Sequence, residues 1–215
     1  MKIKLLSLLL FMASISMSSQ QLYFEYSKTS SSFDYENSQG LELLNLLPKI
    51  NTNLAIGYRF PAIKNKLNII LGLSYNSYGA IGSDEILDNY YEWDVTYAGL
   101  NAGFDYKIFT TRQLLFSFKT TISTEFLVQG NQTLNNQVFN LVGEEEFNQS
   151  LFFVNAGLTM QYPINDRTTI YGQYMVGKSF SVFKESTIDN EQLNIFSHGL
   201  GIGVIVKLST LDCTF

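Results

Sequence analysis

Apolar and polar residues alternate with a period of two in eight stretches of this chain. In the second stretch, for example, Leu54, Ile56 and Tyr58 alternate with Ala55 and Gly57. This alternation predicts β-strands that have one apolar face and one polar face. The predicted strands cover approximately residues 21–31, 54–60, 67–76, 98–106, 114–126, 152–162, 168–178 and 195–208.

The connections between these strands alternate between short and long. Short turns are predicted at Pro61–Lys66, Thr110–Gln113 and Asn165–Arg167, and long polar loops at residues 32–51, 78–91, 130–149 and 179–194. This rhythm predicts an all-β fold, an eight-stranded antiparallel up-and-down barrel. The short turns and both termini then lie at one end of the barrel, and the long loops lie at the other.

Two strands depart from simple alternation. Before the fourth predicted strand, Trp93, Val95 and Tyr97 are apolar at the other parity, which indicates a bulge or a strand that continues beyond a membrane. In the seventh, Tyr171 and Met175 are apolar on the face opposite to Ile170, Tyr174 and Val176, so the orientation of that strand stays open.

Aromatic residues gather near both ends of the predicted strands, as in the interfacial girdles of a membrane barrel. They are Tyr58, Phe60, Phe104, Tyr106 and Tyr162 at the short-turn end, and Tyr75, Tyr78, Tyr90, Tyr91, Trp93, Phe126 and Phe152 at the other. The alternative is a soluble, lipocalin-like periplasmic binding barrel with the apolar face turned inward. The second face consists of Gly, Ser, Thr and Asn with several charged residues, which favours a transmembrane barrel with a polar lumen.

The first residues of the chain predict export. Lys2 and Lys4 precede an apolar run over residues 5–12 and then small residues up to Ser19, a pattern typical of a secretory signal peptide. We therefore expect residues 1–20 to be removed and residues 21–215 to form the barrel domain. Cys213 is the only cysteine, so an intramolecular disulfide is excluded, and the net charge of −5 argues against nucleic acid as a partner.

Taken over the whole mature chain, this pattern resembles the small outer-membrane β-barrel proteins, especially the PorT-like and related barrel domains. The resemblance rests on the rhythm of strands and loops, on the glycines between Gly199 and Gly203, and on the terminal Phe215. It implies a barrel in the outer membrane of a Gram-negative bacterium, surrounded by outer-membrane lipid, with short periplasmic turns and periplasmic termini. It also implies insertion by the barrel-assembly machinery, although Leu211 to Cys213 interrupt the alternation before Phe215.

Five charged residues on the polar face are candidates for the lumen: Glu25, Arg59, Asp105, Lys119 and Glu125. Glu25 and Arg59 are expected at similar depth on adjacent strands, where they could form an ion pair, and Asp105 and Lys119 could pair in the same way. Such residues could form a gate or a proton path. Because buried charges need partners and an eight-stranded barrel has little interior space, a neutralised and packed plug is the favoured interpretation.

Residues that suggest chemistry are few. Ser197 and the only histidine, His198, are adjacent, but neighbouring residues on a strand point to opposite faces, so they cannot form a catalytic dyad with each other. Glu144 to Glu146 form an acidic run without the spacing of a defined cation site. We therefore predict no catalytic residue, no metal and no cofactor, and leave an outer-membrane lipid-modifying enzyme as a minor alternative.

The first long loop contains an apolar segment that could contact a partner: Leu41, Leu43, Leu44, Leu46 and Leu47. It resembles a short amphipathic helix that could cap the barrel, touch lipid or bind a protein. The function expected from the sequence is that of a non-enzymatic outer-membrane barrel with a plugged polar lumen. It would act structurally, by binding a surface partner, or as a component of a secretion apparatus.

Overall fold

The computed structural model describes residues 20–36, 46–63, 66–84, 89–143, 150–181 and 192–208. The predicted signal peptide up to Ser19, the acidic run Glu144 to Glu146, and the terminal residues Cys213 and Phe215 lie outside the described residues. Within the described part of the chain, no helix is long and apolar enough to cross a membrane.

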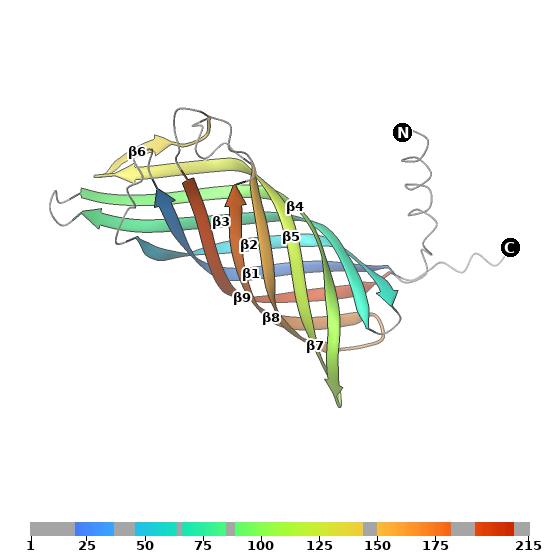
Figure 1. The fold of residues 1–215 in the computed structure, drawn as a ribbon. Coiled ribbons are helices and arrows are strands. Elements are labelled where there is room, and N and C mark those ends of the chain that lie inside the picture. Colours follow the sequence, from blue (N-terminus) through green and yellow to red (C-terminus); the bar gives the residue numbers. More distant parts are fainter. Residues whose placement is uncertain are drawn as a thin grey trace, which may run out of the picture.

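Nine antiparallel strands make up the described structure (Figure 1). They are β1 (Gln21–Glu36), β2 (Leu47–Ile63), β3 (Leu67–Asp84), β4 (Asn89–Thr111), β5 (Leu114–Leu134), β6 (Gln137–Asn140), β7 (Leu151–Pro163), β8 (Thr168–Ser181) and β9 (Gln192–Lys207). All of the eight predicted strands are present, and the short β6 is an addition.

Eight of these strands close into a barrel. The order β4-β3-β2-β1-β9-β8-β7-β5 becomes a ring because β4 also pairs with β5, while β6 pairs only with the end of β5. The eight-stranded antiparallel barrel predicted from the sequence is therefore confirmed.

The strands are staggered as well as closed. A row of paired residues that starts at Gln21 on β1 and passes once around the ring returns to β1 at Ser31, ten residues further along. A stagger of this kind tilts the strands against the barrel axis, commonly by about 35 to 45°. Two residues at the same height on neighbouring strands are therefore not register partners. They are offset from the register by slightly more than one residue.

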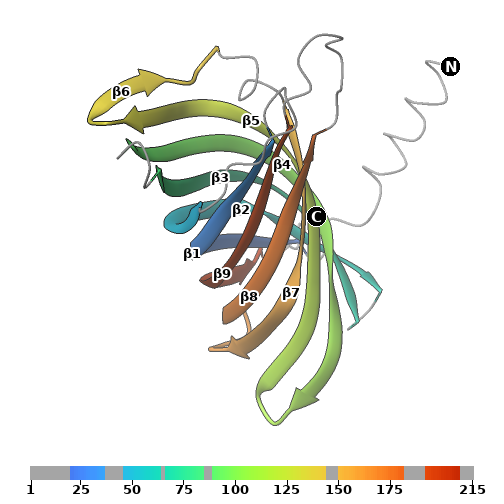
Figure 2. The same ribbon diagram turned by 60° about the vertical axis from the view of Figure 1, so that its left-hand side comes forward.

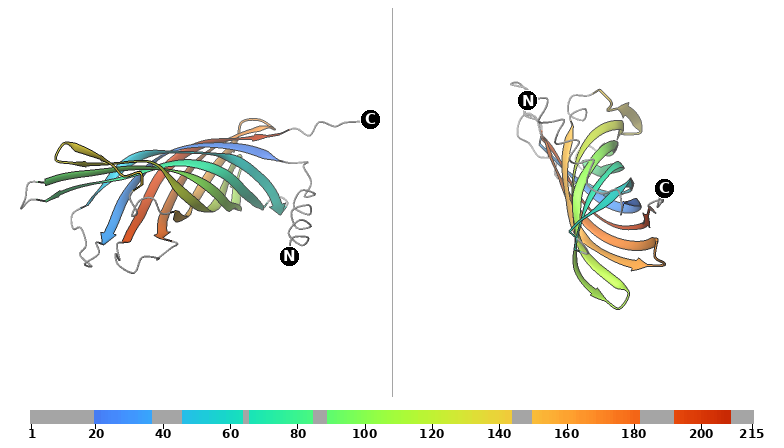
Figure 3. Two further views of the ribbon diagram at one scale, coloured as in Figure 1. Left: turned by 90° about the horizontal axis from the view of Figure 1, so that it is seen from above. Right: turned by 90° about the vertical axis from the view of Figure 1, so that its right-hand side faces the viewer.

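The two described ends of the chain meet at the short-turn end. Gln21 pairs with both Arg59 and Lys207, and the Leu208 amide donates a hydrogen bond of 2.9 Å to the Gln20 carbonyl. At the opposite end, β3, β4, β5 and β6 continue beyond the ends of β1, β8 and β9 (Figures 1 and 3). The loop end of the barrel is therefore asymmetric.

Over the stretches predicted from the sequence, the apolar face of each barrel strand points outward. Leu200 and Ile202 on β9 are each 68 % exposed, whereas Ser197 on the same strand is buried. On β8, Ile170, Tyr174 and Val176 face outward and Tyr171 faces inward, which settles the orientation that the sequence left open. A lipocalin-like barrel would bury these outward positions around its ligand, so that alternative is wrong for this fold.

The irregularity near Trp93 has the second of the two expected causes, because β4 continues beyond its predicted end as far as Asn89. Trp93, Val95 and Tyr97 share the inward parity of the rest of β4 and are buried, so β4 does not switch faces. The bulge lies on β5, where Thr96 pairs with Gln129 and Tyr97 pairs with Leu127, leaving one extra residue between them. Tyr78, Trp93 and Tyr91 accordingly belong to the interior and not to an aromatic girdle.

The third predicted long loop, residues 130–149, is partly a β-hairpin. β5 continues to Leu134 and pairs with β6 through a two-residue turn at Asn135 and Asn136, whose φ angles are +48° and +67°. Positive φ at both positions is the requirement of a type I′ turn, and Asn tolerates it better than most residues. Figure 2 shows this hairpin extending from the loop end of the barrel.

Paired glycines make room for a ring near the short-turn end. Gly57 and Gly72 are register partners on β2 and β3. A Cβ atom on Gly72 would lie 2.3 Å from the hydroxyl oxygen of Tyr23, and one on Gly57 would lie 2.8 Å from the same ring. Tyr23 can therefore fill the interior only because these two positions lack side chains.

Candidate functional site in the barrel lumen

The interior holds three layers from the short-turn end to the loop end, and the first contains a buried ion pair. The Arg59 guanidinium donates to Oδ2 of Asp105 at 2.7 Å, and Gln161 Nε2 donates to the same oxygen at 3.1 Å. Arg59 and Asp105 are only 5 % and 3 % exposed. The pair is therefore held inside the barrel wall with additional hydrogen bonds, as a buried ion pair requires.

A second network lies beside the first. The Lys119 ammonium group forms an ion pair with Glu25, and it also donates to Gln173 Oε1 at 3.1 Å. Gln173 Nε2 donates in turn to Glu25 Oε1 at 2.7 Å, which closes a ring of three side chains. The rings of Tyr23 and Tyr171 lie 5.7 and 5.9 Å from the Lys119 nitrogen, within the range of a cation–π contact.

The two ion pairs exchange the partners expected from the sequence. Arg59 pairs with Asp105 instead of Glu25, and Lys119 pairs with Glu25 instead of Asp105. Asp105 and Lys119 are direct register partners on β4 and β5, yet their side chains reach different neighbours across the lumen. Strand adjacency alone therefore did not predict the pairing, because side chains inside a narrow barrel also meet side chains of strands that are not adjacent.

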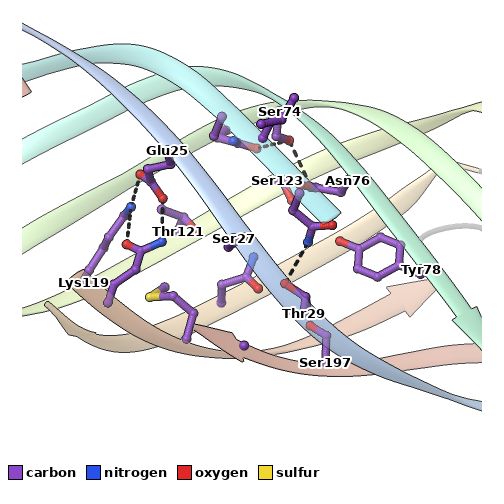
Figure 4. A pocket seen from close by; sticks show the side chains of 18 of the residues that line it. Glu25, Ser27, Thr29, Ser74, Asn76, Tyr78, Lys119, Thr121, Ser123 and Ser197 are labelled. Carbon is purple, nitrogen blue, oxygen red and sulfur yellow. Dashed lines mark hydrogen bonds and ion pairs between the residues drawn. The ribbon is translucent and has the colours of Figure 1, made fainter. Parts of the chain in front are cut away.

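A polar cavity of about 90 Å³ lies above these networks (Figure 4). Its walls are mostly short polar side chains, including Ser27, Thr29, Asn53, Asn101, Asn155 and Ser197. A polar space of this size can hold several water molecules, because each water needs only about 10 to 15 Å³ by this measure and two to four polar partners. The middle layer is thus suited to hydration, and it borders Glu25 and Lys119 below.

Glu125 stands apart from the other lumenal charges. It is fully buried, and its Oε1 accepts hydrogen bonds from Asn76 at 2.7 Å and Ser123 at 2.8 Å, while Tyr78 donates to Oε2 at 3.1 Å. Among the ion pairs of the described residues none includes Glu125. It is therefore held by neutral donors alone.

The third layer, at the loop end, is apolar. Tyr78 stacks on Phe153 with ring centroids 5.1 Å apart and planes within 4°, and Tyr97 lies 6.1 Å from Tyr78. We call this layer the apolar cluster; its buried members are Phe33, Tyr78, Ala80, Trp93, Val95, Tyr97, Leu141, Leu151, Phe153, Leu193 and Ile195. The sequence interpretation treated the whole inner face as polar and therefore missed this cluster. The signal that could have revealed it is the alternation itself, which continues beyond the predicted strand ends and places these apolar residues at inward positions.

The remaining sequence candidates fall in different places. Ser197 is buried in the lumen and His198 is exposed on the outer face, as their adjacency on a strand requires. Leu46 packs against the apolar cluster, whereas Leu47 is 63 % exposed and begins β2, so a helix does not extend to Leu47. Leu41, Leu43 and Leu44 lie outside the described residues.

A charged cluster on the outer face marks the loop-side ends of β2 and β4. The Lys49 ammonium lies 2.5 Å from oxygens of both Glu92 and Asp94, and the Tyr90 hydroxyl donates to Glu92 at 2.9 Å. The hydrogen bond from Lys49 lowers the pKa of Glu92, and the bond from Tyr90 lowers it further. Desolvation lowers the pKa of Lys49, but its bonds to Asp94 and Glu92 outweigh this effect, and the net pKa is raised.

Comparison with known proteins gives a fold and no family. No protein family and no curated protein matches the sequence. The structure is similar to the outer membrane protein OprG from Pseudomonas aeruginosa, with a TM-score of 0.53 over 90 % of this chain and 97 % of that chain, at 11 % identity. The fold is that of a small outer-membrane β-barrel.

Two further barrels of known structure match at lower structural similarity. Neisserial surface protein A matches with a TM-score of 0.48 at 14 % identity, over 87 % of this chain and 97 % of that chain. Ail, the attachment invasion locus protein of Yersinia pestis, matches with a TM-score of 0.40 at 13 % identity, over 88 % of this chain and 99 % of that chain. At these identities the activities of the two proteins do not transfer to this chain.

Proposed function

We propose that this chain is an integral outer-membrane barrel whose lumen is closed and whose loop end binds a surface partner or a component of a secretion apparatus. The packing of side chains in the interior is the observation that carries the proposal. Buried ion pairs occupy the interior near the short-turn end, and the apolar cluster fills it at the loop end. A barrel built in this way is a scaffold for its loop end and a poor route for solutes.

The outer surface supports placement in a membrane. Outward-facing side chains such as Leu73, Leu100 and Leu158 are 56 to 60 % exposed, which water would disfavour and hydrocarbon would accept. Every backbone group of a closed barrel has a partner in the ring, as a lipid environment demands. Both described ends lie at the short-turn end, so the proposal places the termini in the periplasm and the long loops outside the cell.

The β5–β6 hairpin supports binding at the loop end. Val138 is 67 % exposed and Phe139 is 45 % exposed on the four-residue β6, and Leu134 and Val142 are exposed beside them. These apolar side chains lie beyond the barrel wall, where a protein partner could cover them. The described residues offer no corresponding support for catalysis, since His198 and Ser197 point to opposite sides of the barrel wall, and the proposal is non-enzymatic.

The membrane and closure parts are tested together. The mature protein from an outer-membrane fraction is expected to migrate faster on a denaturing gel before boiling than after it, because a closed barrel resists detergent. Liposomes containing the protein should retain small sugars as well as protein-free liposomes do. A single band unaffected by boiling would refute the membrane barrel, and rapid sugar loss would refute the closed lumen.

The partner part needs cross-linking in cells. A Val138→Ser/Phe139→Ser variant should lose cross-linked partners that the wild type captures, while Gln137→Ser on the same strand should retain them. An assignment to PorT-like, secretion-associated barrels would gain support if those partners belong to a secretion apparatus. Equal capture by both variants would remove the hairpin as the binding surface.

A further inference from the structure

The outward-facing band of the barrel is mostly apolar, and its other uncharged polar side chains are chiefly Ser and Thr. We define the band as the outward positions from the short-turn end of each strand up to Ser32, Thr52, Ser77, Thr96, Phe126, Phe152, Phe180 and Asn194. Among the described residues of this band only three side chains are Lys, Arg, His, Asp or Glu: Lys28, Lys178 and His198. All three are basic.

These three residues form one cluster. They lie on the neighbouring strands β1, β9 and β8, with His198 on the central strand. Lys28 pairs with Leu200, two residues from His198, and Lys178 pairs with Phe196, two residues from His198 on the other side. Diagonal neighbours of this kind are about 7 to 8 Å apart, so His198 lies between the two lysines.

The stagger of the barrel brings the cluster to one height. The register rises by ten residues in one circuit of the ring. Lys28 and Lys178 are each displaced by two residues from the register partner of His198, and the rise of the register nearly cancels this displacement in height. Lys28, His198 and Lys178 therefore lie within about 5 Å of one another along the barrel axis. Val206, Val204, Ile202 and Leu200 lie below them on β9, and Phe196 lies above, so the cluster is near the upper edge of the band.

None of the three basic residues has a carboxylate partner among the described residues. Lys28 donates a hydrogen bond of 2.6 Å to Thr52 Oγ1, and the His198 ring lies 6.3 Å from the ring of Tyr174. Cations inside an apolar band are costly unless they reach an anion, and a lysine side chain can extend toward the nearest head groups. The lipid itself is the available source of that anion.

The spacing of the cluster indicates what kind of head group fits. Lys28 and Lys178 are separated by two strand spacings and four residues of register, or about 16 Å between Cα atoms. A single anion can contact both ammonium groups only if both side chains are fully extended toward it. A head group that carries two anionic groups can contact both lysines, with His198 between them.

We propose that Lys28, His198 and Lys178 bind the phosphates of a doubly phosphorylated glycolipid, such as lipid A, in the leaflet at the loop end of the barrel. This inference rests on the membrane placement made under Proposed function. The site would fix one lipid against β1, β8 and β9. That side of the barrel is away from the β5–β6 hairpin, so lipid and protein partner would occupy different faces.

Native mass spectrometry of the detergent-purified barrel provides the test. The wild type should bind doubly phosphorylated lipid A and should bind its dephosphorylated form at least tenfold more weakly. Lys28→Gln/Lys178→Gln should weaken binding of the phosphorylated form by about tenfold or more, because two charge-assisted hydrogen bonds are lost. The matched control is Lys207→Gln, which removes an exposed lysine at the short-turn end and should bind as the wild type does.

Several outcomes would overturn the site. Equal binding by the double variant and by Lys207→Gln would show that lipid binding does not use the cluster. Displacement of the lipid by millimolar inorganic phosphate would indicate a site for free phosphate. Because each protein is first shown to shift on boiling, a failure of lipid binding is distinguishable from a failure of the membrane barrel itself.

Discussion

At the scale of single residues, the lumen holds one carboxylate with a cationic partner, Glu25, and one that accepts only neutral hydrogen bonds among the described residues, Glu125. Lys119 is buried against Glu25 and Gln173, so Lys119→Met leaves the Glu25 carboxylate inside the barrel without its cation. Breaking a buried pair in this way costs about 3 to 5 kcal/mol. We expect Lys119→Met to lower the free energy of unfolding by that amount, measured by urea titration in lipid vesicles.

Two further variants make this prediction specific. Lys119→Met/Glu25→Gln removes both charges and should recover most of the loss, since no uncompensated charge remains. Glu125→Gln is the contrasting single change, because no cation among the described residues pairs with Glu125 and would be left without a partner. It should alter the free energy of unfolding by less than about 1.5 kcal/mol, the size of one hydrogen bond. A larger loss in Glu125→Gln than in Lys119→Met would contradict the assignment of partners.

A second residue-scale prediction concerns the outer charged cluster. Its bond from Lys49 lowers the pKa of Glu92, so the stabilisation from ionised Glu92 is fully present above the ordinary value of 4.5 and is lost as the pH falls through the lowered pKa. Lys49→Met should raise the pKa of Glu92 toward 4.5, measured by carbon-detected NMR titration. Lys66→Met, at the opposite end of the barrel, should leave it unchanged. An unaltered pKa of Glu92 in Lys49→Met would show that the ion pair does not form in solution.

Alternation of residues was sufficient to identify which side chains face inward, but not what those side chains bind. Glu25, Arg59, Asp105 and Lys119 were all placed on the inner face, yet both of their ion pairs were predicted with the wrong partners. The odd or even position of a residue along its strand shows only on which face of the barrel wall the residue lies. The contacts inside also depend on barrel stagger and side-chain length, which act between distant segments of the chain.

At the scale of the elements, the β5–β6 hairpin depends on its two-residue turn. Asn136 has a φ of +67°, which a β-branched side chain adopts only with strain. Asn136→Val should therefore destabilise the hairpin by about 1 to 2 kcal/mol, whereas Asn136→Gly should preserve it. Limited proteolysis of the folded protein checks this, with faster cleavage near residues 134–140 expected only for Asn136→Val. Equal cleavage of both variants would mean that the turn does not limit the opening of the hairpin.

Element boundaries were harder to predict than element number. All eight barrel strands were identified, but β1, β3, β4 and β5 extend beyond their predicted loop-side ends. There the inward residues become apolar and the outward ones polar, as Trp93 and Asp94 illustrate on β4. The period of two continues across this change while the apolar face reverses, and a search for a constant apolar face therefore ends the strand too early.

At the scale of the whole molecule, the proposed closure of the lumen rests on two layers that differ in chemistry and are arranged in series. The ion pairs of Arg59 and Lys119 lie near the short-turn end, and the apolar cluster around Tyr78 and Phe153 lies near the loop end. The polar cavity of about 90 Å³ lies between them. Two barriers in series conduct only when both are open, so loss of either one alone should not produce a channel.

This arrangement predicts a pattern among three variants in planar bilayers. Tyr78→Ala/Phe153→Ala opens the apolar layer, and Arg59→Ala/Asp105→Ala together with Lys119→Ala/Glu25→Ala opens the polar one. Each set alone should give no stable conductance steps, whereas the two sets combined should give steps, because a continuous water path then crosses the barrel. Each variant is first required to shift on boiling, since two core aromatic deletions remove several kcal/mol of stability. Conductance from the apolar-layer variant alone would show that the charged network is not a barrier, and the lumen would then have a single gate at its loop end.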